Sequence, residues 1–266
     1  MRMKRTMFML NCAALIAGSF SCAIATGQTA WVERAHLAFA TAKSTSLGAL
    51  GRQQIFVKHD SGSMHIVDLG LSQRIPISAL SIDGDDTYFS TAVMWRMNDA
   101  LVTPRDIVKL AADGSREVFL HGENIGLDEK ARISGLSVDN GEILIALDMH
   151  AEIAGVKVKH SDILEVDSGV VSVLHSLSEH GLPDAMRVAA VDRTETGTIY
   201  LTFSSGGVVD GISAMPGDVI EFIPNSDSWS TAIRRDQLGL ECNPCDVNAL
   251  ALETSMDTIF KDYFRN

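Results

Sequence analysis

The sequence lacks the short motifs that identify many enzymes. It contains no Walker phosphate-binding loop, no dinucleotide-binding glycine fingerprint and no G-x-S-x-G nucleophile elbow. The Cys-x-x-Cys-His motif of haem attachment is absent too, because Asp246 follows Cys245. The sequence therefore indicates neither a catalytic residue nor a cofactor, and it favours a protein that is not an enzyme.

Cysteine is scarce. Of the four cysteines, Cys12 and Cys22 lie near the N-terminus, which leaves Cys242 and Cys245 in the order Cys-Asn-Pro-Cys. A redox pair of the thioredoxin type belongs at the start of a helix, whereas this pair precedes an expected strand. We expect a small structural disulfide between Cys242 and Cys245, with a free or metal-bound pair as the alternative.

Long apolar runs are absent after Ala25, so no later segment is expected to span a bilayer. The stretch before that point combines a basic start, an apolar run and a small-residue cleavage pattern, at Arg2-Met3-Lys4-Arg5, Met7 to Ile16 and Ala23-Ile24-Ala25. This pattern predicts a signal peptide over residues 1–25 and a single exported domain over residues 26–266. Because the residues before Cys22 form a poor lipobox, we expect a periplasmic or secreted protein rather than a lipoprotein.

Basic residues are too few to balance the acidic ones. The chain has 22 Lys and Arg against 34 Asp and Glu, a net charge of −12. Three of the basic residues and no acidic ones lie in the predicted signal peptide, so the exported domain carries a charge near −15. Such a surface repels phosphate backbones and anionic lipids. We therefore expect no nucleic-acid partner, and a protein, a glycan or a small ligand stays open.

What the sequence does contain is an internal repeat. Gly-Leu pairs begin at Gly70, Gly126, Gly181 and Gly239, at nearly equal spacings along the chain. Each pair precedes an apolar strand, a polar turn and a second strand; the clearest copy has these at Ile133 to Asp139 and Ile143 to Leu147. After a longer loop, a third and a fourth strand complete the unit. The third strand begins with an aspartate at Asp106, Asp162 and Asp218, and these three are equally spaced.

Four short antiparallel strands in a repeat of about 55 residues predict an all-β fold, a β-propeller of four-stranded blades. We expect four blades, or alternatively five, because His36 to Thr41 reads as a surplus second strand. Closure would pair first and second strands from Val247 to Phe260 with third and fourth strands from Ile55 to Val57 and Met64 to Leu69. Such closure removes exposed sheet edges.

The repeat resembles bacterial exported proteins of uncharacterised function that are built from β-propeller-like repeats. The resemblance lies in Phe119 to Leu127, Ile77 to Leu80 and Tyr88 to Thr91. It covers most of the exported domain and implies the fold, but no activity.

In such blades, the loops between second and third strands and the linkers between blades lie on one face. These loops are long, at 92–105, 148–161 and 204–217, and function usually resides on long loops held by a rigid scaffold. Asp106, Asp162 and Asp218 lie on this face, where a ring of carboxylates would suit Ca²⁺. The alternative is that each Asp accepts hydrogen bonds from its own loop backbone. Asp83, Asp139 and Asp192 are expected to form turns on the opposite face.

Two functions are compatible with this pattern. The first is an exported propeller scaffold that binds a protein, a glycan or a small ligand on its long-loop face. The second is a metal-dependent hydrolase or lactonase of the propeller type, for which Asp148, Asp246 and Asn248 lie near suitable loops. Since fold analogy is a weak argument for activity, the first is favoured.

Overall fold

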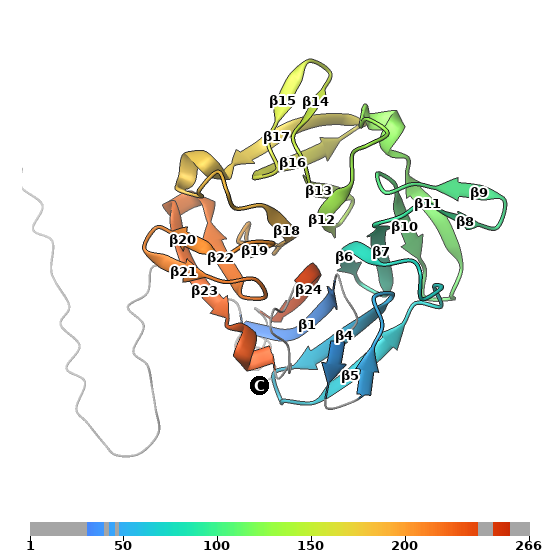
Figure 1. The fold of residues 1–266 in the computed structure, drawn as a ribbon, viewed down its shortest axis with the longest axis horizontal. Helices are drawn as coiled ribbons and strands as arrows, with labels where there is room; N and C mark the ends of the chain where they lie inside the picture. The colour runs from blue at the N-terminus through green and yellow to red at the C-terminus, as the bar shows by residue number, and fades with distance from the viewer. Residues whose placement is uncertain (1–30, 40–42, 46–47, 239–246, 256–266) are drawn as a thin grey trace, which may run out of the picture. The chain divides into compact units, whose positions relative to one another are not determined.

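The structure is a computed structural model that describes residues 31–39, 43–45, 48–238 and 247–255. Its regular elements in these ranges are β-strands and short 3-10 helices. The main strands form four antiparallel sheets of four strands each, arranged as blades around a centre (Figure 1). This confirms the all-β fold and the predicted four-bladed β-propeller. Within the described ranges, no helix is long and apolar enough to cross a membrane.

We label the blades A to D in their order around the ring. Blade A contains β24 (Val247–Ser255), β1 (Trp31–Phe39), β4 (Gln54–His59) and β5 (Met64–Asp68). Blade B contains β6 (Ile77–Asp83), β7 (Asp86–Thr91), β10 (Ile107–Leu110) and β11 (Arg116–Leu120). Blade C contains β12 (Ile133–Asp139), β13 (Glu142–Leu147), β16 (Asp162–Asp167) and β17 (Val170–Ser176). Blade D contains β18 (Val188–Arg193), β19 (Ile199–Phe203), β22 (Val219–Ile223) and β23 (Ser228–Ile233).

The innermost strands β6, β12, β18 and β24 surround the axis, and each lies against the innermost strands of the neighbouring blades (Figure 1). They are largely buried because both faces are covered, as in β12, where only Asp139 is partly exposed. The core consists of apolar layers at the blade seams; between blades B and C, for example, Leu136 and Ile145 pack with Ile107. Burial of this apolar surface is the main stabilising contribution to the ring.

Ring closure differs from the expected arrangement. Strand β1 pairs with β24 on one edge and with β4 on the other, so it is the second strand of blade A. The segment from His36 that read as surplus is therefore part of this closing strand, and it fits there because Leu37 and Phe39 are buried. Blade A thus takes three strands from the N-terminal part and one from the C-terminal part. The last part of the range expected to hold the first and second strands, 256–260, lies outside the described residues, as does the predicted signal peptide.

The long loops are small β-hairpins rather than irregular segments. They are β2 (Lys43–Thr45) with β3 (Gly48–Leu50), β8 (Trp95–Met97) with β9 (Ala100–Val102), β14 (Ala151–Ile153) with β15 (Val156–Val158), and β20 (Gly207–Val209) with β21 (Ile212–Ala214). Two of the hairpin turns carry consecutive positive φ angles, at Ala154-Gly155 and Asp210-Gly211. Such turns match the twist of a two-stranded ribbon.

The repeated Gly-Leu pairs hold these hairpins in place. Short helices precede two of the pairs, η1 (Gly122–Ile125) before Gly126 and η2 (Leu177–His180) before Gly181. Each glycine ends its helix in the left-handed conformation, with φ of 79° and 88°. The following leucine is buried against the hairpin of the next blade, as Leu127 is with Ile153 and Val158. Helices η3 (Pro224–Ser226) and η4 (Arg235–Leu238) lie in blade D and after it.

Candidate functional site

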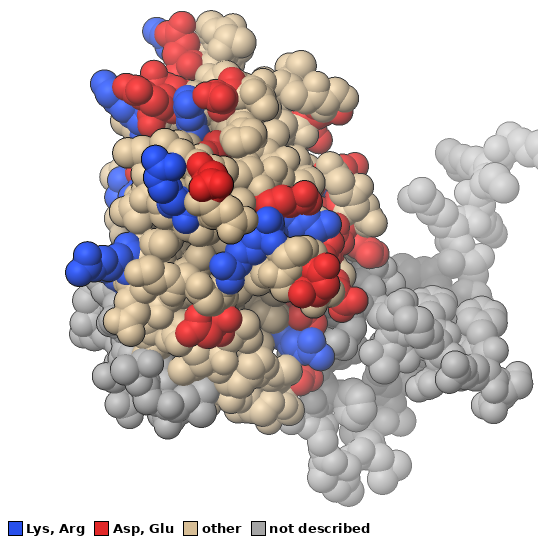
Figure 2. All heavy atoms as spheres, turned by 90° about the vertical axis from the view of Figure 1, so that its right-hand side faces the viewer, with Lys and Arg blue, Asp and Glu red and all other residues tan. Residues whose placement is uncertain are grey.

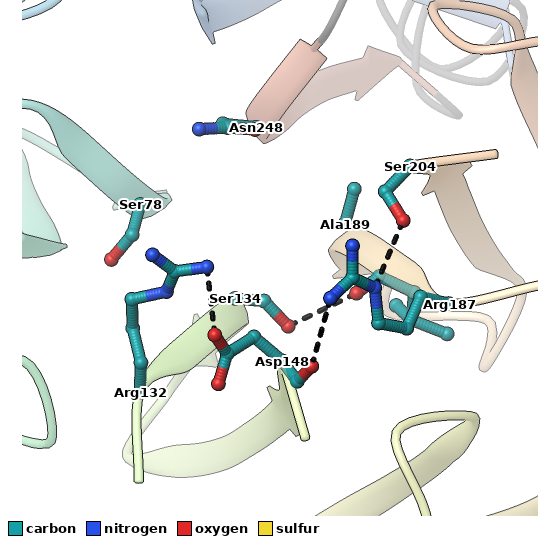
Figure 3. A pocket seen from close by; sticks show the side chains of 9 residues that line it. Ser78, Arg132, Ser134, Asp148, Arg187, Ala189, Ser204 and Asn248 are labelled. Carbon is teal, nitrogen blue, oxygen red and sulfur yellow. Dashed lines mark hydrogen bonds and ion pairs between the residues drawn. The ribbon is translucent and has the colours of Figure 1, made fainter. Parts of the chain in front are cut away.

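A β-bulge lies at the start of the innermost strand in every blade. In β6, β12, β18 and β24 the second residue has no partner in the pairing register, because the flanking residues pair with adjacent residues of the second strand. Bulges re-aim side chains and are common beside functional sites. The four bulge residues are Ser78, Ser134, Ala189 and Asn248. All of them line one cavity at the starts of the innermost strands, which we call the channel-mouth cavity (Figure 3).

Two arginines reach the same cavity from the residues just before β12 and β18. The backbone carbonyl of Arg132 accepts a hydrogen bond from the N–H of Asp148, at 3.1 Å, and that of Arg187 accepts one from Ser204, at 3.0 Å. Asp148 and Ser204 follow the second strands of the same two blades. The sheet pairing therefore places each arginine beside the residue that begins the long hairpin loop. This is the long-loop face that was predicted from the sequence.

The side chains of these four residues interact across the cavity (Figure 3). Arg132 Nη2 lies 2.7 Å from Asp148 Oδ2 in an ion pair. Arg187 donates through Nε to Ser204 Oγ at 3.2 Å and through Nη1 to the backbone carbonyl of Asp148 at 3.3 Å. Asp148 therefore contacts both arginines, but its carboxylate pairs with only one of them.

The cavity has a volume of about 90 Å³ and is rich in hydrogen-bond donors. A guanidinium carries five N–H groups, of which the contacts above use one in Arg132 and two in Arg187. The hydroxyl of Ser78 is buried and has no partner among the described residues. The side chain of Asn248 extends from β24 and lines the cavity (Figure 3). The site can therefore donate several hydrogen bonds to one bound group, and Asp148 Oδ1, which is buried and has no partner among the described residues, can accept one.

The three aspartates predicted as calcium ligands occur in three different blades and are almost fully buried. Asp106 accepts hydrogen bonds from the N–H groups of Thr103 and Gly122, at 2.7 and 3.0 Å. Asp162 accepts from the N–H of Lys159 at 2.8 Å, and Asp218 from the N–H groups of Met215 and Arg235 at 3.0 and 2.9 Å. These are the backbone contacts of the alternative interpretation. Among the described residues, no three His, Cys, Asp or Glu side chains form a metal-binding group, and calcium binding stays a prediction.

Two other expectations concern residues outside the described ranges. Cys242 and Cys245 lie in the segment 239–246, so the predicted disulfide stays a prediction. Asp246 lies in the same segment. Of the three residues considered for hydrolase chemistry, Asp148 and Asn248 do line one cavity.

Sequence reasoning missed the two arginines. The signal was present, because Arg132 and Arg187 occupy the same position of consecutive repeats, immediately before the first strand. It was weak because blade B has Pro76 at that position, so the arginines do not recur throughout. Their convergence with Asn248 also depends on ring closure by β24.

No protein-family model matches the sequence, and a comparison with curated proteins finds no match. Among solved structures, a streptogramin B lyase matches with 12% identity and a TM-score of 0.32, over 76% of this chain and 58% of the lyase. The extracellular domain of the putative one-component system BT4673 from B. thetaiotaomicron matches with 10% identity and a TM-score of 0.33, over 74% of this chain and 22% of that one. A luciferin-regenerating enzyme matches with 12% identity and a TM-score of 0.33, over 80% and 61%.

The chain thus spans less than two thirds of the length of each of these three structures. Identities and scores this low carry no argument about activity, substrate or partner.

Proposed function

We propose that this protein is an exported β-propeller scaffold that binds a small anionic ligand in the channel-mouth cavity. The observation that carries the proposal is the convergence of Arg132 and Arg187, from consecutive blades, on one small polar cavity with a single carboxylate between them. Among the described residues, Arg187 makes no ion pair. Its charge is therefore available to an anion.

The donor set suits an oxygen anion. Arginine presents planar, paired N–H groups that match the two oxygens of a carboxylate, and hydrogen bonds to ionised groups are stronger than neutral ones. The unpartnered hydroxyl of Ser78 and the amide of Asn248 add neutral donors from blades B and A. An anion bound here would gain contacts from blades A, B, C and D.

The positive charge is local to this site. The exported domain is acidic overall, and on the side of the domain in Figure 2 basic and acidic side chains lie intermixed. A general basic surface, such as one that binds polyanions, is therefore not what attracts the ligand. Recognition would depend on the two arginines and on the short range at which they act, since surface charges are screened within about 8 Å at physiological salt.

The metal-dependent hydrolase alternative is not favoured. Two guanidinium groups beside Asp148 and Asn248 oppose the binding of a divalent cation between them, because like charges repel strongly where water is partly excluded. The cavity contains one carboxylate among its described lining residues, whereas a hard cation prefers several oxygen ligands.

The proposal is tested by titrating the purified protein with acetate and with inorganic phosphate, followed by NMR or thermal shift at low ionic strength. We expect binding by the wild type and a loss of at least about tenfold in affinity for Arg187→Gln, because an interaction with a charged group is removed. Arg96→Gln, on the exposed β8–β9 hairpin, is the matched control and should bind as the wild type does.

A second variant fills the cavity. Ala189→Phe places a ring where Ala189 lines the channel-mouth cavity and should abolish binding while all charges remain. If both anions bind Arg187→Gln and Ala189→Phe as tightly as the wild type, the ligand does not bind at this cavity and the proposal is wrong.

A further inference from the structure

A larger cleft adjoins the channel-mouth cavity. This outer cleft has a volume of about 580 Å³ and shares Asp148, Arg187 and Ser204 with the cavity. It extends away from the axis between the β14–β15 hairpin of blade C and the linker that leads into blade D. Because Arg187 lines both spaces, a molecule held by its anionic end at the arginines can extend the rest of its length along the outer cleft.

Two histidines form one wall of the outer cleft. His150 and His160 flank the β14–β15 hairpin, and their rings meet edge to face with centroids 4.5 Å apart. Burial, together with the nearby His150 and Arg187, lowers the pKa of His160 below its ordinary value. His160 Nδ1 is buried and has no partner among the described residues. Near neutral pH His160 therefore presents an uncharged imidazole to the cleft.

The remaining lining favours an uncharged body. Met149 is 41% exposed and lies in the cleft beside Ala185, so both offer apolar contact area. Thioether groups and aromatic rings make favourable contacts with aromatic ligands. Asp184 also lines the cleft, and its carboxylate disfavours a second negative charge there.

We infer that the ligand is an elongated monocarboxylic acid, whose carboxylate binds Arg132 and Arg187 and whose uncharged, aromatic or aliphatic body lies in the outer cleft against Met149 and the His150–His160 pair. The inference rests on the proposed function, since it places the same anion at the same arginines. It adds the chemical class of the ligand. A carboxylate alone, such as acetate, uses only the inner cavity, whereas an arylalkanoate uses both spaces.

The test compares acetate, 3-phenylpropionate and the neutral 3-phenylpropanamide by NMR titration of the whole protein. We expect 3-phenylpropionate to bind about tenfold or more tightly than acetate, because its phenyl ring becomes buried. The amide should bind at least about tenfold more weakly than the acid, because it lacks the charge that the arginines recognise.

Variants separate the two parts of the site. Met149→Ala and His150→Ala, both at exposed positions, should remove most of the advantage of 3-phenylpropionate and leave acetate binding unchanged. Met94→Ala, an exposed methionine in blade B, is the matched control and should change neither.

The outcomes distinguish this inference from the proposed function. If acetate and 3-phenylpropionate bind equally and both depend on Arg187, the ligand class is wrong and the proposed function stands. If the amide binds as tightly as the acid, or if neither acid binds, the arginines do not anchor an anion and both are overturned.

Discussion

The carboxylate of Asp192 accepts a hydrogen bond from the backbone N–H of Leu252 at 2.7 Å, across the seam between blade D and the closing blade A. The same contact occurs at two other seams. Ser81 Oγ accepts from the N–H of Val138 at 2.8 Å, and Ser137 Oγ accepts from the N–H of Arg193 at 3.0 Å. One position of the innermost strand thus links each of three blades to the next. Asp192 is the only ionisable residue among these three.

Asp192 makes ring stability depend on pH. Burial raises the pKa of Asp192 from 3.8 to about 7. A carboxyl group with a raised pKa contributes stability that is complete below its unfolded pKa and is lost as the pH rises through the folded pKa. We therefore expect the free energy of unfolding to fall by about 3 kcal/mol between about pH 5 and about pH 8, as measured by urea unfolding.

Asp192→Asn removes the charge and should lack this part of the decline, because the amide can still accept from Leu252. Asp167→Asn, at an exposed position, is the matched control and should retain the full decline. A decline in Asp192→Asn equal to that of the wild type would show that Asp192 is not the titrating group.

The position of Asp192 also shows what the sequence does and does not determine. From its place at the end of an apolar run, Asp192 was expected at a turn with Asp83 and Asp139. Those two do pair across their turns, with Asp86 and Glu142, whereas Asp192 pairs with Tyr200 inside the sheet. The turn after β18 is longer, so Asp192 takes the strand position that Ser81 and Ser137 hold in their blades. Residue identity suggested the wrong register, and only strand pairing fixes the right one.

The blade repeat itself was predictable because its signals are local: the Gly-Leu linker, alternating apolar residues and turn residues at regular spacing. The site was not, because it depends on contacts between distant segments. Ser78 and Asn248 share a cavity only because β24 closes the ring, and a β-bulge is not visible in the pattern of residues. Arg132 and Arg187 do share one position of the repeat, immediately before the first strand, but nothing in the sequence marks that position as part of a site.

The aspartate that precedes or begins the third strand in blades B, C and D should be required for stability. Asp162→Asn replaces one of the two carboxylate oxygens with an NH₂ group, which is a donor. Either the N–H of Lys159 or the hydroxyl of Ser176 then loses its acceptor. Leaving a buried donor unsatisfied costs about 1–3 kcal/mol, so we expect the free energy of unfolding to fall by that amount. Asp60→Asn, at an exposed position, should be neutral.

The same variants test the calcium prediction. If Asp162 serves only its own loop, the loss in stability should be the same with added calcium and with a chelator. A wild-type melting temperature that rises with calcium, with the rise absent in Asp162→Asn, would instead support the cation site.

Substitution of either residue of a Gly-Leu linker should lower the free energy of unfolding, for a different reason in each case. Gly126 has a φ of 79°, and an alanine in this left-handed conformation costs about 1–2 kcal/mol. Leu127 is 2% exposed and packs under the β14–β15 hairpin, so Leu127→Ala should cost about 2–5 kcal/mol. Chemical denaturation measures both losses, with the exposed Glu129→Ala as control. Equal and negligible effects would show that the linkers do not hold the hairpins.

Closure of the ring by a single C-terminal strand gives the last prediction. Strand β24 supplies Leu250, fully buried, to the seam of blades D and A, and it pairs with β1 along nearly its whole length. A chain that ends at Asp246 lacks this strand. Its absence exposes the N–H and C=O groups of β1 that pair with β24, and it uncovers the apolar seam between blades D and A. We expect it to lose its cooperative thermal transition, because an open sheet edge and an uncovered apolar seam are both unfavourable.

A synthetic peptide of residues 247–266, added in trans, should restore the transition in a concentration-dependent way, since a ligand that binds only the folded state stabilises it by mass action. The same peptide with Leu250→Lys should not restore it, because a charge would be buried without a partner. A shortened chain that melts as the intact protein does, with or without peptide, would show that β24 does not close the ring.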